Sequence, residues 1–291
     1  MLNNKMSVVL ATHNEEENLE KCLKAVKSIA SEIVVVDGSS TDRTVEIARK
    51  FGARVIETDN PQMFHINKQK GLVAAREEWI LQLDADEVVG EELAEEMNQV
   101  VNLTEEQIQN RRFDPEKKQL FIRHQKLLEE RDGRVGKAAD ETVAFFVPRR
   151  NLFLGKFLKY GGTYPDGVIR LVKNHKARFP CKSVHEQIEI FGRVDWLEND
   201  LLHYDSPTFS KYLMRANRYT TLTADELERQ NTDLSLFNWV KYVVWKPVDT
   251  FSRIFILHAG FRDGFRGFAW ALFSGLHWPV AYFKYRSRRK G

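Results

Sequence analysis

The chain has 291 residues, of which 43% are hydrophobic and 29% are charged, so its composition is typical of a globular protein and argues against disorder. Its two cysteines, Cys22 and Cys181, are far apart in the sequence, which argues against a disulfide framework or a cysteine-based zinc site. The length suits one large domain with an appendage, or two modest domains. The first apolar run is short and leads into acidic residues, so we expect no signal peptide and a cytoplasmic protein.

The charge is unevenly distributed along the chain. Residues 241–291 contain ten Lys or Arg and two Asp, a net charge of +8, whereas the first 240 residues carry a net charge of −5. The basic end is also rich in aromatic residues. These two features together predict that the C-terminal part binds an anionic surface.

The first hundred residues alternate between short apolar runs and segments with apolar residues at helical spacing. Strands are expected at 6–11, 33–36, 54–57 and 79–83, and helices at 18–30, 44–51, 65–76 and 91–101. Near-continuous apolar strands between amphipathic helices predict an α/β fold, with a parallel sheet covered by helices on both faces. Such sheets bind ligands at the carboxyl ends of their strands.

Polar segments follow three of these strands, at residues 12–17, 37–42 and 84–87. None is a glycine-rich dinucleotide fingerprint or a P-loop, which argues against both of those classes. The last segment places Asp84, Asp86 and Glu87 close together, and their repulsion costs stability unless a positive group balances it. We expect a divalent cation and the phosphates of a ligand to do so. Alternatively, Asp84 caps a turn and the next two acids begin an exposed helix.

Three motifs in this order, VVLATHNEEENLEKCL, IVVVDGSSTDRT and WILQLDADE, resemble those of family 2 glycosyltransferases of GT-A fold. The later motifs FFVPRRNLFLGKFLKYGGTYPDGVIRLVKN, VHEQIEI and LLHYD are similar to the lipopolysaccharide core β-1,4-glucosyltransferase subgroup. The resemblance implies a GT-A catalytic domain over residues 1–205, with a Rossmann-like, mostly parallel sheet. Residues 103–141 would be a charged helical insert, and 206–291 a helical, basic and aromatic region that associates with a membrane.

The resemblance also implies a donor site and a metal site. Asp86 would be the more direct ligand of Mg²⁺ or Mn²⁺, and Asp84 would lie nearer the nucleotide and sugar. Asp37 would accept a hydrogen bond from a uracil ring, although an Asx-turn is its alternative role. Lys70 would face the donor, unless it is a solvated helix lysine. The implied donor-binding residues are Thr12, Asn14, Glu15, Asp37, Lys70, Asp84 and Arg170.

Glycosyl transfer to a hydroxyl needs a base that takes the proton as the new bond forms. The resemblance implies that Glu186 is this base, with Asp166 in reserve. The candidates for acceptor binding are Asp166, His185, Arg149 and Arg150. An exposed strand acid, a packed histidine and surface salt bridges are the alternative roles of these side chains.

The C-terminal segment 267–283 has 17 residues without Lys, Arg, Asp or Glu, which is short for crossing a bilayer. We expect helices that lie on an anionic membrane. A helical subdomain packed on the sheet is the second interpretation, and a transmembrane hairpin is the third.

The sequence therefore predicts an inverting, metal-dependent hexosyltransferase at the inner face of the cell membrane. It would move a hexose from a nucleotide-sugar donor, UDP-linked, to a hydroxyl of a lipid-linked saccharide, such as lipopolysaccharide core or another cell-envelope glycan. No nucleic-acid partner is expected. A nucleotidyltransferase is one alternative, although the loop ATHNEEEN lacks the glycines that a triphosphate loop needs. A non-catalytic membrane-surface binding module is another.

Overall fold

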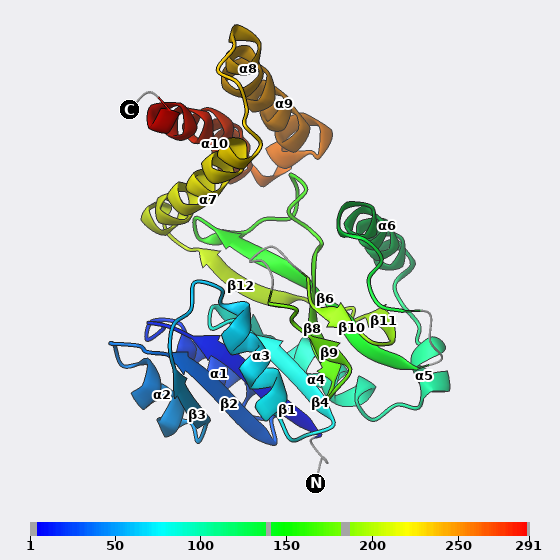
Figure 1. Cartoon of the computed structure of the whole chain (residues 1–291). Coiled ribbons are helices and arrows are strands. Elements are labelled where there is room, and N and C mark those ends of the chain that lie inside the picture. The colour runs from blue at the N-terminus through cyan, green and yellow to red at the C-terminus, as the bar shows by residue number, and fades with distance from the viewer. Residues whose placement is uncertain (1–4, 138–140, 182–186, 290–291) are drawn as a thin grey trace. The chain divides into compact units, whose positions relative to one another are not determined.

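The computed structural model describes residues 5–137, 141–181 and 187–289. The chain folds as two compact units (Figure 1). The first runs to Arg149 and resumes from Pro165 to His203, and the second consists of Arg150–Tyr164 and the chain from Tyr204 onward. Each unit is described by itself.

The first unit contains the predicted parallel sheet. Its strands stand in the order β3-β2-β1-β4, and every neighbouring pair is parallel. They are β1 (Met6–Thr12), β2 (Glu32–Gly38), β3 (Arg54–Thr58) and β4 (Trp79–Leu83). The register pairs Thr12 with Asp37, so the polar residues that end β1 and β2 lie side by side.

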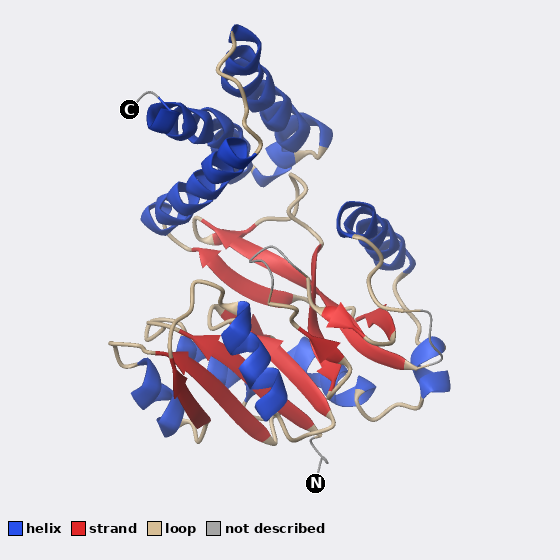
Figure 2. Ribbon diagram, viewed as in Figure 1, coloured by secondary structure: helices blue, strands red, loops and turns tan. Residues whose placement is uncertain are grey.

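Helices cover both faces of this sheet (Figure 2). They are α1 (Leu19–Val26), α2 (Thr44–Lys50), α3 (His65–Ala74) and α4 (Glu91–Val100). Successive strand residues point to opposite faces, so Val8 packs in the core under α1 whereas Val9 packs under α3. Helix α3 approaches β1 closely at Gly71, where a Cβ would lie 2.3 Å from a methyl group of Val9. The predicted α/β class is confirmed.

An antiparallel extension completes the sheet. Strand β8 (Asp166–Lys173) pairs antiparallel with β4, and β6 (Thr142–Phe153) pairs antiparallel with β8. Strand β12 (Leu201–Ser206) pairs antiparallel with the short β5 (Glu87–Val89). The remaining strands are β7 (Lys156–Phe157), β9 (Ala177–Arg178), β10 (Glu189–Ile190) and β11 (Arg193–Trp196). This extension brings distant parts of the chain to the end of β4.

The charged segment after α4 contains the helices α5 (Glu105–Gln109) and α6 (Pro115–Asp132). The side chain of Asp114 accepts hydrogen bonds from the first free N–H groups of α6, and Pro115 takes the first helical position. Helix α6 packs within the first unit through the buried ring of Phe121, which stacks on Trp196, and through His124, whose ring also contacts Trp196.

The second unit is mainly helical, as predicted for the C-terminal region. Its elements after β12 are α7 (Phe209–Arg229), α8 (Leu236–Val240), η1 (Lys241–Trp245), α9 (Lys246–Ser252), η2 (Arg253–Leu257), η3 (Gly260–Asp263) and α10 (Phe265–Arg289). The rings of Tyr242, Tyr282 and Tyr285 form its core together with Leu227 of α7. Across the residues that the structure describes, every helix is too short or too polar to cross a bilayer.

Candidate active site

The carboxylate of Asp84, directly after β4, is held between two cations. The Nζ of Lys68 lies 2.6 Å from its Oδ1, and an Nη of Arg170 lies 2.6 Å from its Oδ2. Burial by itself would raise the pKa of Asp84, but Arg170 and Lys68 outweigh burial and hold that pKa well below its ordinary value. Asp84 is therefore an ionised carboxylate in a fixed position.

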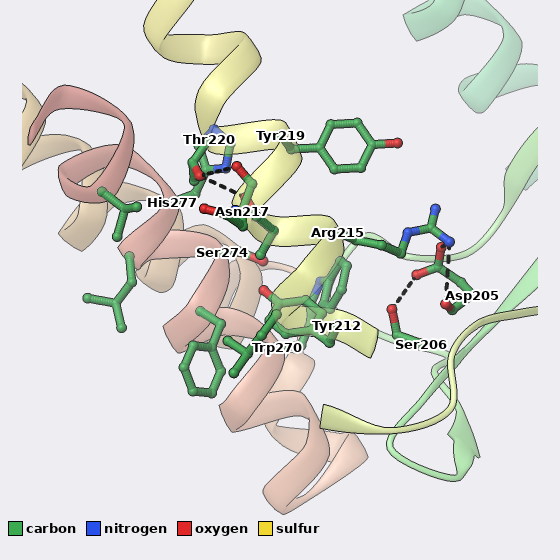
Figure 3. Close-up of a pocket in the computed structure, with 15 residues that line it drawn as sticks. Asp205, Ser206, Tyr212, Arg215, Asn217, Tyr219, Thr220, Trp270, Ser274 and His277 are labelled. Carbon is green, nitrogen blue, oxygen red and sulfur yellow. Dashed lines mark hydrogen bonds and ion pairs between the residues drawn. The ribbon is translucent and has the colours of Figure 1, made fainter. Parts of the chain in front are cut away.

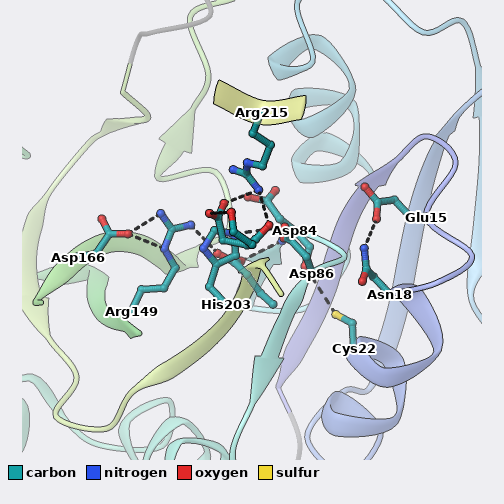
Figure 4. Close-up of polar contacts among 12 residues, drawn as sticks. Glu15, Asn18, Cys22, Asp84, Asp86, Arg149, Asp166, His203 and Arg215 are labelled. Carbon is teal, nitrogen blue, oxygen red and sulfur yellow. Dashed lines mark hydrogen bonds and ion pairs between the residues drawn. The ribbon is translucent and has the colours of Figure 1, made fainter. Parts of the chain in front are cut away.

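Glu87 extends this network into the interior. One carboxylate oxygen of Glu87 lies 2.7 Å from Arg170 and 3.0 Å from Arg149, and the other accepts a hydrogen bond from the backbone N–H of Asp84. Arg149 also donates two hydrogen bonds, of 2.9 and 2.7 Å, to Asp166 (Figure 4). Glu87 is fully buried and begins a strand, so the alternative of an exposed helix is wrong for this residue.

Three carboxylates in this cluster thus face three basic side chains: Asp84, Glu87 and Asp166 against Lys68, Arg149 and Arg170. The expectation that a metal ion must balance the acids needs correction. The cations come from α3, β6 and β8, and the folding of the sheet places them at the end of β4. Removing one partner from such a buried network leaves an uncompensated charge, so the network fixes the local geometry.

Asp86 points to a different partner. Strand β12 pairs with β5 so that His203 stands opposite Glu87. The Nε2 of His203 lies 3.3 Å from Oδ2 of Asp86; His203 is buried, whereas the side chain of Asp86 is 21% exposed. No group of three His, Cys, Asp or Glu placed to hold a metal occurs among the described residues. Asp86 and His203 are the residues that could hold a divalent ion at this edge of the sheet.

Thr12 and Asp37 meet at the ends of β1 and β2. The hydroxyl of Thr12 donates a 3.0 Å hydrogen bond to Oδ1 of Asp37, which is 1% exposed. Asp37 also accepts from the hydroxyl of Ser40 at 2.6 Å and from the backbone N–H of Ser40 at 2.8 Å. Three of about four lone-pair sites of this carboxylate are therefore used, and one on Oδ2 remains.

The loops after β1 and β2 are bonded to each other through Asn14 and Glu15. The side chain of Asn14 accepts a 2.8 Å hydrogen bond from the backbone N–H of Thr41, and the backbone N–H of Asn14 donates to the hydroxyl of Ser40. The N–H of Glu15 donates to the hydroxyl of Thr44. Asn14 has a φ of 54°, a left-handed conformation that asparagine tolerates well. The two loops thus form one rigid rim.

The remaining predicted site residues include Lys70, whose partner Thr58 pairs with Gly38 at the end of β2. Lys70 is exposed, and its Nζ donates to the hydroxyl of Thr58. Arg150 is half-buried and begins the second unit. The predicted base Glu186 and its neighbour His185 lie outside the described residues.

Two residues of the site were missed from the sequence, Lys68 and His203. Helical spacing contains a signal for the first, because Lys68 lies four residues before the buried Leu72 and therefore shares its face, whereas Lys70 does not. His203 belongs to the motif LLHYD, but its proximity to Asp86 depends on the pairing of β12 with β5.

With this geometry established, comparison with known proteins identifies the family. The model for glycosyl transferase family 2 matches residues 7–161, which is more than half of the chain. The protein belongs to glycosyltransferase family 2. The resemblance seen in the motifs is therefore confirmed, and neither a nucleotidyltransferase nor a non-catalytic module is favoured.

Curated relatives match most of the length of this chain. The chain is 26% identical over 270 residues to an uncharacterised glycosyltransferase of Rickettsia typhi, covering 91% of this chain and 80% of the relative. It is 25% identical over 282 residues to the lipopolysaccharide core biosynthesis glycosyltransferase LpsC of Rhizobium meliloti, covering 92% and 86%.

Among solved structures, glucosyl-3-phosphoglycerate synthase from Mycobacterium tuberculosis, in complex with Mn²⁺ and UDP-glucose, aligns with 25% sequence identity. The alignment covers 30% of this chain and 34% of that chain, with a TM-score of 0.27.

Proposed function

We propose that this family 2 glycosyltransferase is an inverting enzyme that transfers a hexose from a UDP-linked donor to a hydroxyl of a lipid-linked saccharide. Lipopolysaccharide core or another cell-envelope glycan is the acceptor class. The observation that carries the proposal is the pairing of Asp86 with His203 beside the fixed carboxylate of Asp84, at the carboxyl end of β4. Ligands of parallel α/β sheets bind at this edge.

The donor's uridine would lie against the rim formed by the loops after β1 and β2. The remaining acceptor position on Asp37 suits the ring N–H of uracil, and Thr12 and Ser40 hold that carboxylate in place. Asn14 and Glu15 keep the rim in one conformation through their bonds to the β2 loop. A rigid rim binds a nucleotide with little loss of conformational freedom.

Asp86 and His203 fit a divalent ion, Mg²⁺ or Mn²⁺, because a carboxylate oxygen and an imidazole nitrogen, both possible ligands of such an ion, lie 3.3 Å apart at the end of β4. When bound, the ion would neutralise the charge that develops on the departing diphosphate. Asp84 has each carboxylate oxygen engaged by a cation, so we assign it a different task. It would accept a hydrogen bond from a hydroxyl of the donor sugar and orient that sugar.

The acceptor hydroxyl must lose its proton as it attacks the anomeric carbon, and Glu186 is proposed to take it. This assignment rests on the motif VHEQIEI alone. A single in-line attack of this kind inverts the configuration at the anomeric carbon. Arg149, held rigidly by Asp166 and Glu87, is a candidate for positioning an anionic acceptor.

The proposed lipid-linked acceptor is supported by the second unit and by one relative. Large apolar side chains of α8, η1 and α9 are exposed, including Phe237 at 75%, Trp245 at 68% and Val248 at 59%. The inner face of the same segment is also apolar, with Trp239 and Tyr242 in the core. A helix that is apolar on both faces and flanked by basic residues suits the surface of an anionic membrane. LpsC, by its name, acts in lipopolysaccharide core biosynthesis.

The test uses the full-length protein with a panel of UDP-, GDP- and CMP-sugars in the presence of Mn²⁺. We expect UDP release above background only with a UDP-hexose, and faster release when membrane lipids from a Gram-negative bacterium are added. Thermal shift with each nucleotide provides an independent measure of binding. Binding and turnover with another nucleotide in place of UDP would contradict the donor assignment, and turnover unaffected by lipid would contradict the acceptor class.

A further inference from the structure

The second unit contains a groove between α7 and α10 with a volume of about 660 Å³ (Figure 3). Its size and its mainly apolar walls are those of a ligand site. Small residues of both helices line the groove, Ala216 on α7 and Ser274 on α10, and the rings of Tyr212 and Trp270, whose centroids are 6.2 Å apart, line it as well. Two close-packed helices would otherwise fill this space with side chains.

Apolar side chains on the rim of the groove face solvent. Leu213 is 46% exposed, Leu276 is 41% exposed and Val280 is 44% exposed. Among the side chains that line the groove, Asp205 and Arg215 are charged and form an ion pair with each other, and the other polar side chains belong to Ser, Thr, Asn, Tyr and His. Burial and the nearby Asp205 raise the pKa of Tyr212 to about 12, and burial lowers the pKa of His277, whose ring also bonds to Thr223. An apolar chain in the groove would therefore not meet an unbalanced charge along its length.

A cation lies beside the groove. The ammonium of Lys284 donates to the backbone carbonyl of Asn217 at 2.7 Å and to its side-chain oxygen at 2.6 Å. It also donates to the hydroxyls of Thr220 at 2.8 Å and Thr221 at 2.9 Å. Asn217 and Thr220 line the groove.

All of these acceptors are uncharged, so they satisfy the N–H groups of Lys284 but do not balance its charge. Within the described chain, the contacts of Lys284 include no carboxylate. At the opposite end of the groove, the charge of Arg215 is balanced by its ion pair with Asp205. The groove thus has an apolar channel with an uncompensated positive charge next to it.

We propose that the α7–α10 groove binds one hydrocarbon chain of an anionic lipid, with the lipid's phosphate at Lys284. The occupant is the lipid anchor of the acceptor, so this inference rests on the proposed lipid-linked acceptor. The charge of Lys284 favours an amphiphile with a phosphate over a purely apolar ligand and over the apolar face of a second copy. The assignment gives the second unit the role of binding the acceptor's anchor.

The binding test uses calorimetry on the full-length protein with three soluble probes: decyl phosphate, decanol and inorganic phosphate, each below the concentration at which it forms micelles. Decyl phosphate should bind most tightly, decanol about tenfold more weakly for loss of the electrostatic attraction to Lys284, and phosphate not measurably. Equal binding of decanol and decyl phosphate would overturn the role of Lys284, and no binding of either would overturn the groove. Concentration-dependent dimerisation that excludes the probes would assign the groove to a second copy and also overturn the proposal.

Two variants test whether the probes bind in the groove or elsewhere on α10. Ser274→Phe fills the groove, and Ser287→Phe adds the same ring to an exposed position of the same helix. We expect Ser274→Phe to abolish binding of decyl phosphate and Ser287→Phe to leave it unchanged. Lys284→Gln should weaken decyl phosphate about tenfold and leave decanol unaffected. A second filling variant, Ala216→Phe, and circular dichroism of both variants control for misfolding. If both filling variants fold and bind decyl phosphate normally, the groove is not the binding site.

Transfer kinetics test whether the occupant of the groove is the acceptor's anchor or a bulk membrane lipid. Ser274→Phe should raise KM for a lipid-linked acceptor and leave KM for the same acceptor without its chain unchanged. Unchanged KM for both acceptors would overturn the assignment to the acceptor's anchor. The calorimetric measurement needs no sugar donor. If decyl phosphate binds but no sugar is transferred, the proposed function fails and the proposed lipid site does not.

Discussion

The imidazole Nε2 of His203 lies 3.3 Å from a carboxylate oxygen of Asp86, while the neighbouring Asp84 is held by Lys68 and Arg170 instead. The two aspartates of the motif DAD therefore have different surroundings although they are separated by one residue. Asp84 belongs to a network of ion pairs that fixes the end of β4, and Asp86 faces a neutral or protonated ring. This difference leads to separate predictions for the two carboxylates.

Arg170 joins Asp84, Glu87 and Gln82, so its loss should destabilise the fold. We expect Arg170→Met to lower the free energy of unfolding by about 3–5 kcal/mol, because Asp84 and the buried Glu87 each lose one of their two cationic partners. Arg178→Met is the matched control, since Arg178 pairs with Glu189 on the surface and should change stability by about 1 kcal/mol or less. Urea unfolding followed by circular dichroism measures both. Similar values for the two variants would mean that the buried network adds no stability.

The contribution of Asp84 should depend on pH in a defined direction. Arg170 and Lys68 lower its pKa in the folded state, so its stabilisation is complete above the unfolded pKa of about 3.9. That stabilisation is lost as the pH falls through the lower folded pKa. The difference in unfolding free energy between the wild type and Asp84→Asn should be constant from about pH 5 upward and should shrink below about pH 4. A difference that grows on acidification would contradict this assignment.

Lys68 and Lys70 offer a paired test on one helix. We expect Lys68→Met to weaken UDP-hexose binding about tenfold, because Asp84 loses one of the cations that orient it. Lys70→Met should have little effect, because its side chain is exposed and bonds to Thr58. Calorimetry with UDP-glucose and Mn²⁺ compares the two, and melting curves control for folding. If only Lys70→Met weakens the binding of UDP-glucose, Lys70 is the lysine that faces the donor, as expected from the sequence.

The parallel half of the sheet and the polar ends of its strands could be predicted from sequence because they depend on local periodicity. Val8 and Val9 alternate between the two cores, as a buried strand requires. The cations around Asp84 could not be predicted in the same way. Arg170 reaches Asp84, and Arg149 reaches Glu87, through antiparallel pairings of strands that lie far along the chain, and local patterns contain no information on that register.

Glu186 remains the proposed base and can be tested directly. Glu186→Gln preserves the size of the side chain but cannot accept the proton, so the transfer rate should fall about 10²–10⁴-fold. Binding of UDP and Mn²⁺ should stay as in the wild type. Product formation in a radiolabelled transfer assay measures the rate, and an unchanged rate would remove Glu186 as the base. Asp166→Asn serves as the comparison for the reserve candidate.

The central claim is that Asp86 and His203 hold the divalent ion that accompanies the nucleotide-sugar. The most direct measurement is titration of Mn²⁺ followed by electron paramagnetic resonance, with and without UDP. Two protein ligands are few, so the wild type should bind Mn²⁺ tightly only when UDP supplies phosphate oxygens. Asp86→Asn and His203→Gln should lose this binding, and Asp84→Asn should retain it. Mn²⁺ binding that persists in both Asp86→Asn and His203→Gln would contradict the claim.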